Sequence, residues 1–263
     1  MSSTGSMRNF TDCSRRMKIL GIIPARYSSR RFPGKPLAEI RGKPMIRRVY
    51  EQALKCSLLN EVVIATDDDR IVDCIRSFNG NVVITPDSIN SGTERCNAVI
   101  ETLTGGAGFD VVINIQGDEP FIDPQQIAEL AGMFHEKNLL IGTLVKKIIR
   151  TEDLSDPNVV KVVFDKNYRA LYFSRHAIPY LRGSGITEWC REGNYYKHVG
   201  IYGYRTRILS EITRLPVSSL EKAESLEQLR WLENGYAIHV RETDFESIAI
   251  DTPEDLLKIT NIS

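Results

Sequence analysis

Four cationic side chains follow one short apolar run near the start of the chain. The run Ile19–Ile23 has the composition of a buried strand, and Arg26, Arg30, Arg31 and Lys35 come directly after it. In open α/β sheets, ligands bind beyond the carboxyl ends of the strands. Arginine offers forked donors that match phosphate oxygens, and lysine offers a point charge. The loop therefore predicts a binding site for a polyanionic nucleotide.

Two carboxylates are candidates for a metal site beside that loop. Asp118 lies in Asn114-Ile-Gln-Gly-Asp-Glu-Pro120, which continues the apolar run Val111–Ile115. A carboxylate beside a phosphate cradle is the usual setting for Mg²⁺, so we expect Asp118 to bind this ion. The plainer alternative is a turn in which Asp118 caps backbone amides. Asp251 could complete a two-carboxylate site, although the sequence that follows it is equally typical of an ordinary helix start.

Three further segments have side chains that suit a small polar ligand. Ser91-Gly-Thr-Glu-Arg95 opens a predicted helix, where free amides and an arginine can hold a carboxylate or the edge of a base. Glu227 and Gln228 could point into a cleft from another helix. One face of a predicted strand, suited to a sugar, carries His198, Gly200, Tyr202 and Tyr204. A capped surface helix, a solvated helix face and a half-buried strand remain the plainer alternatives.

These residues require a sheet whose strand ends meet along one edge. Apolar runs predict strands at 19–23, 62–66, 82–85 and 111–115. Helices are predicted between them, at 44–57, up to 78, at 92–103 and from 123. Continuous Val and Ile runs that alternate with helices are typical of a parallel sheet covered on both faces. We therefore predict an α/β fold with a Rossmann-like, doubly wound, mostly parallel sheet.

The pattern changes after residue 138. Predicted strands come closer together, at 141–145, 159–164, 169–173 and 198–204, and long polar loops surround 182–193. A helix is predicted at 220–234, and a last one begins at Pro253. We predict a nucleotide-binding part at 17–138 and a smaller, mixed, β-rich part for sugar binding and dimerisation at 139–263. The last helix should return to the main sheet, and residues 1–16 are expected to be a disordered extension or tag.

Composition and missing motifs exclude several classes of protein. Lys plus Arg equals Asp plus Glu at 34 each, so no overall field favours nucleic acid or a membrane surface. Five cysteines without a CxxC pair argue against a disulfide framework and a zinc ribbon. No apolar run reaches the ~20 residues that span a bilayer, and the polar start is not a secretory signal. We expect a cytoplasmic protein. Neither GxGxxG nor GxxxxGK[ST] occurs, which disfavours dinucleotide oxidoreductases and P-loop ATPases.

The motifs, taken in order, resemble one family from about Lys18 to Lys258. They are Ile23-Pro-Ala-Arg-Tyr27, Arg31-Phe-Pro-Gly-Lys-Pro36, Ala65-Thr-Asp67, Ser91-Gly-Thr-Glu-Arg95, Asn114-Ile-Gln-Gly-Asp-Glu-Pro120, Ala170-Leu-Tyr-Phe-Ser-Arg-His-Ala-Ile-Pro179, His198-Val-Gly-Ile-Tyr-Gly-Tyr204, Leu226-Glu-Gln-Leu-Arg230 and Asp251-Thr-Pro-Glu-Asp-Leu256. This set is similar to the CMP-Kdo synthetases, the 3-deoxy-manno-octulosonate cytidylyltransferases. The resemblance implies a nucleotidyltransferase-type fold and a homodimer. It also implies transfer of CMP from CTP to Kdo for lipopolysaccharide synthesis.

The resemblance also assigns roles to single residues. Catalytic roles through the triphosphate and the metal fall to Arg26, Arg31, Lys35 and Asp118. The nucleotide site comprises Pro24, Ala25, Arg26, Arg31, Lys35, Thr66, Asp67, Ser91 and Gly92. The sugar site comprises Arg95, Gln116, Arg175, His198, Tyr202, Glu227 and Gln228. The Mg²⁺ ligands are Asp118 and Asp251.

Two departures from the family pattern bear on these assignments. Arg30 stands where the family usually has a small or polar residue, and the segment before Asp251 lacks the family's usual glycines. The nearest alternative substrate is another acid sugar, such as a sialic acid or an amino-substituted Kdo. A non-catalytic sensor that keeps the fold is a second alternative, and a loss of Lys35 or Asp118 would mark it. Both residues are present.

Overall fold

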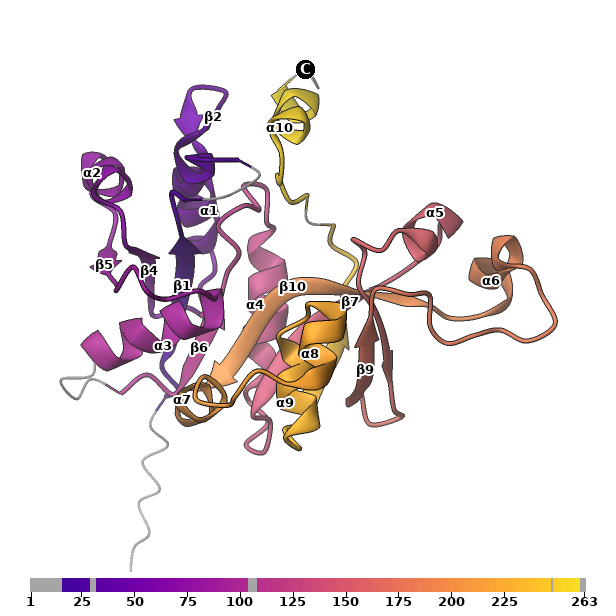
Figure 1. The fold of residues 1–263 in the computed structure, drawn as a ribbon. Coiled ribbons are helices and arrows are strands. Elements are labelled where there is room, and N and C mark those ends of the chain that lie inside the picture. The colour runs from indigo at the N-terminus through magenta and orange to yellow at the C-terminus, as the bar shows by residue number, and fades with distance from the viewer. Residues whose placement is uncertain (1–15, 29–31, 104–107, 247, 261–263) are drawn as a thin grey trace, which may run out of the picture.

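A large twisted sheet runs through the molecule, with helices packed on both faces (Figure 1). The computed structural model describes residues 16–28, 32–103, 108–246 and 248–260. Arg30 and Arg31, and most of the predicted N-terminal extension, lie outside the described residues. No helix within these ranges is long and apolar enough to cross a bilayer.

The main path of the sheet has the strand order β11-β7-β10-β6-β1-β4-β5, and β8 and β9 join it as a side branch at β10. All strands of the main path run parallel except β10, which is antiparallel to both its neighbours. The strands are β1 (Ile19–Ala25), β4 (Glu61–Thr66), β5 (Val82–Ile84), β6 (Val111–Asn114), β7 (Ile141–Lys147), β8 (Lys161–Phe164), β9 (Ala170–Ser174), β10 (Tyr196–Arg205) and β11 (Ile238–Glu242). A separate small pair is formed by β2 (Glu39–Ile40) and β3 (Lys43–Pro44). The predicted fold class is confirmed.

Helices connect and cover these strands. In the first half they are the 3-10 turn η1 (Lys35–Leu37), α1 (Met45–Ala53), α2 (Asp69–Ser77), α3 (Gly92–Leu103) and α4 (Pro124–Met133). In the second half they are α5 (Thr151–Ser155), α6 (Ile186–Glu192), α7 (Thr206–Ile212), α8 (Ser219–Glu224), α9 (Gln228–Glu233) and α10 (Pro253–Thr260). The hairpin of β8 and β9 packs against α9 and shares the core there, whereas the segment with α5 and α6 projects from the main body as an arm (Figure 1).

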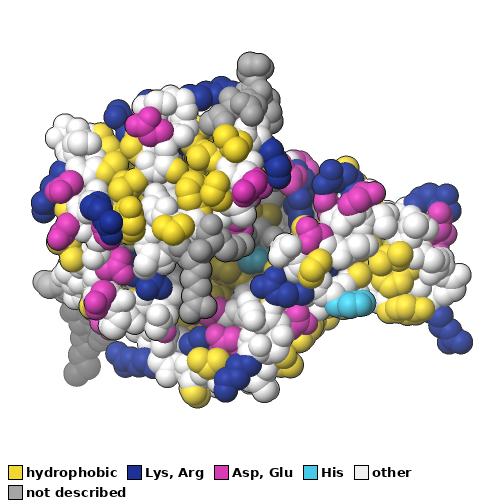
Figure 2. Space-filling view, turned by 45° about the horizontal axis from the view of Figure 1, so that its top comes forward, with side chains coloured by type: hydrophobic (Ala, Val, Ile, Leu, Met, Phe, Trp, Pro, Cys, Tyr) yellow, Lys and Arg dark blue, Asp and Glu magenta, His cyan; other side chains and the backbone are white. Residues whose placement is uncertain are grey.

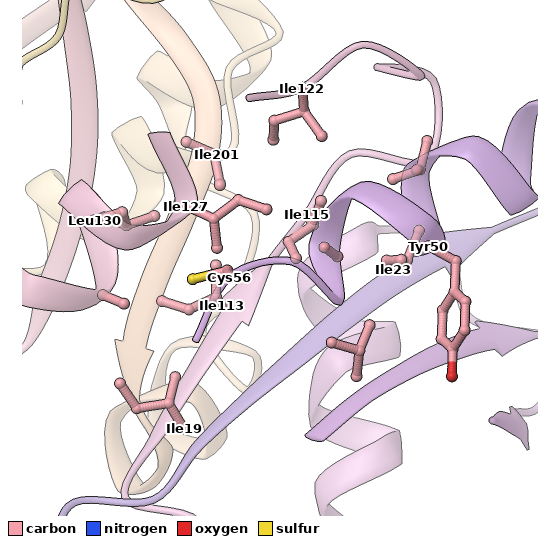
Figure 3. Close-up of a cluster of buried hydrophobic side chains, with 14 of the residues drawn as sticks. Ile19, Ile23, Tyr50, Cys56, Ile113, Ile115, Ile122, Ile127, Leu130 and Ile201 are labelled. Atoms are coloured by element: carbon pink, nitrogen blue, oxygen red, sulfur yellow. The ribbon is translucent and has the colours of Figure 1, made fainter. Parts of the chain in front are cut away.

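Two hydrophobic cores lie on opposite faces of the sheet. Along β1, Ile19 and Ile23 belong to one core and Leu20 and Ile22 to the other, as the two-residue period of a strand requires. The first core packs against α1, α2 and α4, and Figure 3 shows its centre. The second packs against α3, α7 and α9. Burial on both faces explains why the strands read as continuous apolar runs.

The predicted helix at 220–234 is wrong in one respect, because the structure has two helices there. Ser225 adopts a left-handed conformation, with φ 53°, and ends α8. Arg230 in α9 reaches back to Glu221 in α8, with 2.7 Å between Nε and the carboxylate. This nearly buried ion pair ties the two short helices together. The sequence did not predict the break, because the spacing of the leucines in this segment fits one continuous helix.

Other elements were not predicted. Helix α6 lies within the stretch predicted as polar loop, and its Trp189 is buried against Tyr195, with parallel rings 5.9 Å apart. The edge strand β11 and helix α7 were also missed. These segments are short, so periodicity over a few residues gives little signal.

Candidate active site

The carboxyl ends of β1, β4 and β6 meet at one edge of the sheet. Ala25, at the end of β1, pairs with Thr66 at the end of β4. The turn after β6 packs closely beside them, since a Cβ on Gly117 would lie 2.8 Å from the carbonyl oxygen of Pro24. The start of α3 joins them, because a Cβ on Gly92 would lie 3.6 Å from the Pro24 ring. These contacts bring together residues assigned to the nucleotide.

A lysine bridges the two candidate metal carboxylates. Lys35 Nζ lies 2.7 Å from Asp118 Oδ2 and 3.3 Å from Asp251 Oδ1. The lysine side chain is 15% exposed, and the two carboxylates are 26% and 39% exposed. Three charges from distant parts of the chain therefore meet at a site that is partly shielded from water. Their attraction is stronger there than on an open surface.

The segment before α10 brings Asp251 to this place. The amide of Ile250 donates to the backbone oxygen of Asp118 at 2.9 Å. Ile250 is fully buried against Ile40 and Met45, beside Phe32. A backbone hydrogen bond and an apolar anchor thus fix the residue next to Asp251. In this chain, the position does not depend on the glycines that the family commonly has before it.

The two carboxylates fit a Mg²⁺ ion. Mg²⁺ prefers oxygen ligands and is usually held by one or two carboxylates together with substrate phosphates. Within the described residues, no group of three or more His, Cys, Asp and Glu side chains is arranged to hold a metal ion. Asp118 and Asp251 would supply two carboxylates, and substrate phosphates would supply further oxygen ligands.

A second charged group lies at the end of β4. Asp67 Oδ2 accepts a hydrogen bond from Arg95 Nη2 at 2.9 Å and lies 3.9 Å from Arg26 Nε. Arg95 also bonds the hydroxyl of Thr85 and is only 1% exposed. The guanidinium of Arg95 therefore holds a carboxylate of the protein itself. Its assignment to the sugar stays a prediction.

A third group of polar side chains connects α3, β10 and the start of α9. Thr93 Oγ1 donates to Glu227 Oε2 at 2.7 Å. Burial raises the pKa of Glu227, against hydrogen bonds from Thr93 and Ser91 that lower it. Burial, together with the nearby Glu227 charge, also raises the pKa of Tyr202 well above its usual value. A buried polar group of this kind can bind hydroxyl groups in a water-poor setting.

His198 extends this group along β10. Its ring lies 5.0 Å from Tyr202 and 5.3 Å from Phe173, and Nε2 is 2.9 Å from Thr143 Oγ1. A bulge between Val199 and Tyr202 interrupts the pairing with β7, yet His198 and Tyr202 remain in ring contact. The predicted sharing of one face by these two side chains is confirmed.

Comparison with known proteins identifies the family. The family model described as cytidylyltransferase matches residues 20–247. The chain belongs to the cytidylyltransferase family. A 3-deoxy-manno-octulosonate cytidylyltransferase from Parabacteroides distasonis is 54% identical over 246 residues, which cover 92% of this chain and 96% of that protein. One of the same name from Bacteroides thetaiotaomicron is 52% identical, covering 91% and 96%.

A solved structure agrees with these cytidylyltransferase relatives. It is a CMP:2-keto-3-deoxy-manno-octonic acid synthetase complexed with CTP, with a TM-score of 0.85 and 41% identity. The match covers 92% of this chain and 97% of that one. The resemblance to CMP-Kdo synthetases predicted from the motifs is confirmed, and the protein is a nucleotidyltransferase.

Two amide side chains assigned to the sugar by the cytidylyltransferase pattern lie around β10 and α9. Gln116, after β6, donates from Nε2 to the carbonyl oxygen of Gly200 at 2.7 Å. Gln228 is nearly buried at the start of α9, next to Glu227. Gln116 therefore links the turn that carries Asp118 to the strand that carries His198.

Arg175, also assigned to the sugar, is held by backbone oxygens. Its guanidinium donates to three backbone carbonyls, those of Pro157, Glu224 and Ser225, at 2.6 to 3.3 Å. These bonds fix Arg175 between the arm and α8. Within the described residues, its hydrogen bonds go to none of the groups described above, and its sugar-binding role stays a prediction. Arg31, assigned to the triphosphate, lies outside the described residues.

Asn114 belongs to the site but was not among the predicted site residues. It pairs with Tyr202 across the sheet, and its amide lies beside Gly92. Asn114 is 4% exposed, and its Oδ1 has no hydrogen-bond partner among the described residues. The hydroxyl of Tyr202 is likewise unpartnered there. Buried polar atoms without partners are rare, and the sequence signal was available, because Asn114 begins the motif that contains Asp118.

We expect Asn114→Leu to reduce activity without reducing stability. Leucine has a similar shape, and replacing a buried acceptor that lacks a partner removes a desolvation cost of about 1–3 kcal/mol. The melting temperature should stay equal or rise, while kcat/KM falls about tenfold through a lost contact to a sugar hydroxyl. Calorimetry and steady-state kinetics measure the two effects. A lower melting temperature with unchanged kinetics would show that the amide serves the fold alone.

We also expect His198 to make folding stability depend on pH. Burial lowers its pKa to about 3 from the ordinary 6.5. Below pH 6.5, the unfolded chain binds a proton that the folded chain does not. Folding stability therefore decreases as the pH is lowered through that range. Between pH 7 and pH 5, the wild type should lose about 1–2 kcal/mol more free energy of unfolding than His198→Gln. Urea unfolding at both pH values measures this, and an identical loss in both proteins would contradict it.

Proposed function

We propose that the protein transfers CMP from CTP to the anomeric hydroxyl of Kdo, giving CMP-Kdo and pyrophosphate. The observation that carries this proposal is the meeting of Lys35, Asp118 and Asp251 beyond the strand ends. Relatives about half identical over nearly the whole chain are named 3-deoxy-manno-octulosonate cytidylyltransferases. A neighbour in structure was solved with CTP.

In the reaction, the anomeric oxygen of Kdo attacks the α-phosphorus of CTP in line. The new oxygen–phosphorus bond forms as the bond to the β-phosphate oxygen breaks, and pyrophosphate leaves with the electron pair. The hydroxyl proton passes to solvent, since no side chain stands out as a general base. The protein's part is to position both substrates and neutralise charge, for which Arg26 and Lys35 supply cations. Arg31 would add a third.

Mg²⁺ is the cofactor we propose, held by Asp118 and Asp251. When bound, it would polarise the phosphate oxygens and lower the pKa of the attacking hydroxyl. Asp118 is fixed by the turn after β6, and Asp251 by the buried Ile250 beside it. The two carboxylates provide the hard oxygen donors that this ion prefers.

For the acid sugar, we propose the polar group around Glu227, Tyr202 and His198. These side chains come from the start of α9 and from β10, and Gln116 donates to the backbone of Gly200 in β10. Kdo is a polyol with one carboxylate, so buried donors and acceptors can select it by its hydroxyl pattern. A related acid sugar is the alternative, which the names of the relatives do not favour.

The experiment is pyrophosphate release with CTP, Mg²⁺ and Kdo. Controls omit Kdo, replace CTP by ATP, or replace Kdo by a sialic acid or by an amino-substituted Kdo. We expect release only with CTP, and at the highest kcat/KM with Kdo. A higher kcat/KM with another acid sugar would overturn the proposed substrate, and release without any sugar would overturn the transfer.

We further propose a cytoplasmic homodimer that serves lipopolysaccharide synthesis. The family resemblance implies both the pathway and pairing through the second half of the chain. Tyr180 and Ile186 in the arm are 75% and 41% exposed, and apolar side chains gather on this arm (Figure 2). Exposed apolar surface of this kind favours contact with a second copy. Sedimentation of the wild type and of Tyr180→Asp tests the dimer.

A further inference from the structure

An aromatic side chain is clamped at the base of the phosphate-binding loop. The guanidinium carbon of Arg70, on α2, lies 3.3 Å from the centre of the Tyr27 ring. A guanidinium over the face of an aromatic ring is attracted to its negative potential. Tyr27 follows the end of β1 by two residues, so this contact joins the loop to a helix that begins after β4.

Arg70 is itself held in a fixed position. Its Nε and Nη2 donate to the two carboxylate oxygens of Asp68 at 2.9 and 2.6 Å. Asp68 is the N-cap of α2 and accepts from the backbone amide of Arg70 at 3.0 Å. Because a forked pair of this kind fixes the plane of the guanidinium, the Tyr27 ring rests on a rigid surface.

The other end of the loop closes on the same tyrosine. The amide of Gly34 donates to the carbonyl oxygen of Tyr27 at 2.9 Å. Gly34 has φ 72°, and a Cβ there would lie 3.2 Å from the Tyr27 ring. The two ends of the loop, at Tyr27 and Gly34, therefore lie side by side, and the Tyr27 ring lies between Gly34 and Arg70.

The residues on either side of this clamp are the described cations of the loop. Arg26 precedes Tyr27 and donates to the carbonyl oxygen of Asn90 at 3.3 Å. Lys35 follows Gly34 and reaches Asp118. A shift of Tyr27 would therefore move the backbone of both cations at once.

We propose that Arg70 and Tyr27 are positioning residues for CTP, acting through the placement of Arg26 and Lys35 on the triphosphate. This inference rests on the proposed function. Arg70 is 60% exposed, and its own charge is paired with Asp68. Its role is to hold the Tyr27 ring. Removing Arg70 should therefore weaken binding of the nucleotide phosphates and leave binding of the acid sugar unchanged.

The test compares Arg70→Ala with Arg70→Lys, and Tyr27→Leu with Tyr27→Phe. The alanine and leucine variants should raise the Kd and KM for CTP about fivefold, with the KM for Kdo unchanged. The lysine variant should restore part of the affinity, and the phenylalanine variant nearly all of it, since the ring face remains. Loss of affinity should be smaller for CMP, which lacks the β- and γ-phosphates.

A matched control is Arg47→Ala. Arg47 lies on α1, with its guanidinium carbon 5.3 Å from the Phe78 ring, and takes no part in the contact of Arg70 with Tyr27. It should change neither CTP constant. The double variant Tyr27→Leu with Arg70→Ala should lose no more affinity than the worse single variant, because both changes break one contact.

The inference fails if Arg70→Ala keeps wild-type constants for CTP, whether or not its melting temperature falls. It also fails if CTP and CMP lose affinity equally, or if the KM for Kdo rises as much. If Tyr27→Leu does not fold, the exposed Arg70 decides alone. If the wild type forms CMP-Kdo and Arg70→Ala has the same constants for CTP, this inference is wrong and the proposed function still holds.

Discussion

Asp118→Asn should lower kcat by about 100-fold or more and leave the fold intact. Asparagine keeps the shape of the side chain, and the backbone oxygen of Asp118 still accepts from Ile250. The variant loses one of two negative charges that face Lys35, and with it a hard anionic ligand for Mg²⁺. Steady-state kinetics at saturating CTP, Kdo and Mg²⁺ measure the loss. Circular dichroism and the melting temperature report the fold.

A control carboxylate is available outside the residues assigned to the site. Asp165, in the turn between β8 and β9, is 23% exposed and pairs with Arg169, much as Asp118 pairs with Lys35. Asp165→Asn should leave kcat within about twofold of wild type, because a change of one paired carboxylate is not in itself a catalytic loss. If Asp118→Asn turned over CTP and Kdo normally, Asp118 would have no role in the metal site.

The edge of the sheet that carries the site could be predicted, because it depends on short sequence patterns and on the direction of the strands. Apolar runs give the parallel strands, and the carboxyl ends of parallel strands share one edge of the sheet. Lys35 and Asp118 each come shortly after such a run, so their meeting follows from chain order and sheet direction. The same reasoning brings Thr66 and Asp67 to that edge.

Contacts that depend on tertiary packing were not predictable in the same way. Asp251 follows Lys35 by 216 residues in the sequence. It reaches the lysine because its neighbour Ile250 is buried against Ile40 and Met45. Periodicity says nothing about such a distant contact. The residues alone allowed Arg95 to hold a carboxylate, yet only the structure identifies that carboxylate as Asp67. Ser225 ends a helix through a backbone conformation that serine rarely adopts, so its residue type gave no warning.

Lys35→Met should separate nucleotide binding from metal binding. The ammonium group lies between Asp118 and Asp251, and a divalent cation at these carboxylates must compete with it. Without nucleotide, the methionine variant should therefore bind Mn²⁺ more tightly than wild type, by about tenfold, because one positive charge no longer opposes the ion. With nucleotide, kcat/KM for CTP should fall about 100-fold or more, because a cation for the triphosphate is lost.

The opposite directions of these two effects make the test informative. Free Mn²⁺ is measured by electron paramagnetic resonance during titration, and kinetics give kcat/KM. Lys43→Met is the control, since Lys43 pairs with Glu51 at 2.8 Å on a more exposed surface and should alter neither quantity. Weaker Mn²⁺ binding by Lys35→Met would mean that the lysine supports the carboxylates instead of competing for them. An unchanged affinity would mean that the ion binds away from both aspartates, so that Lys35 serves the triphosphate alone.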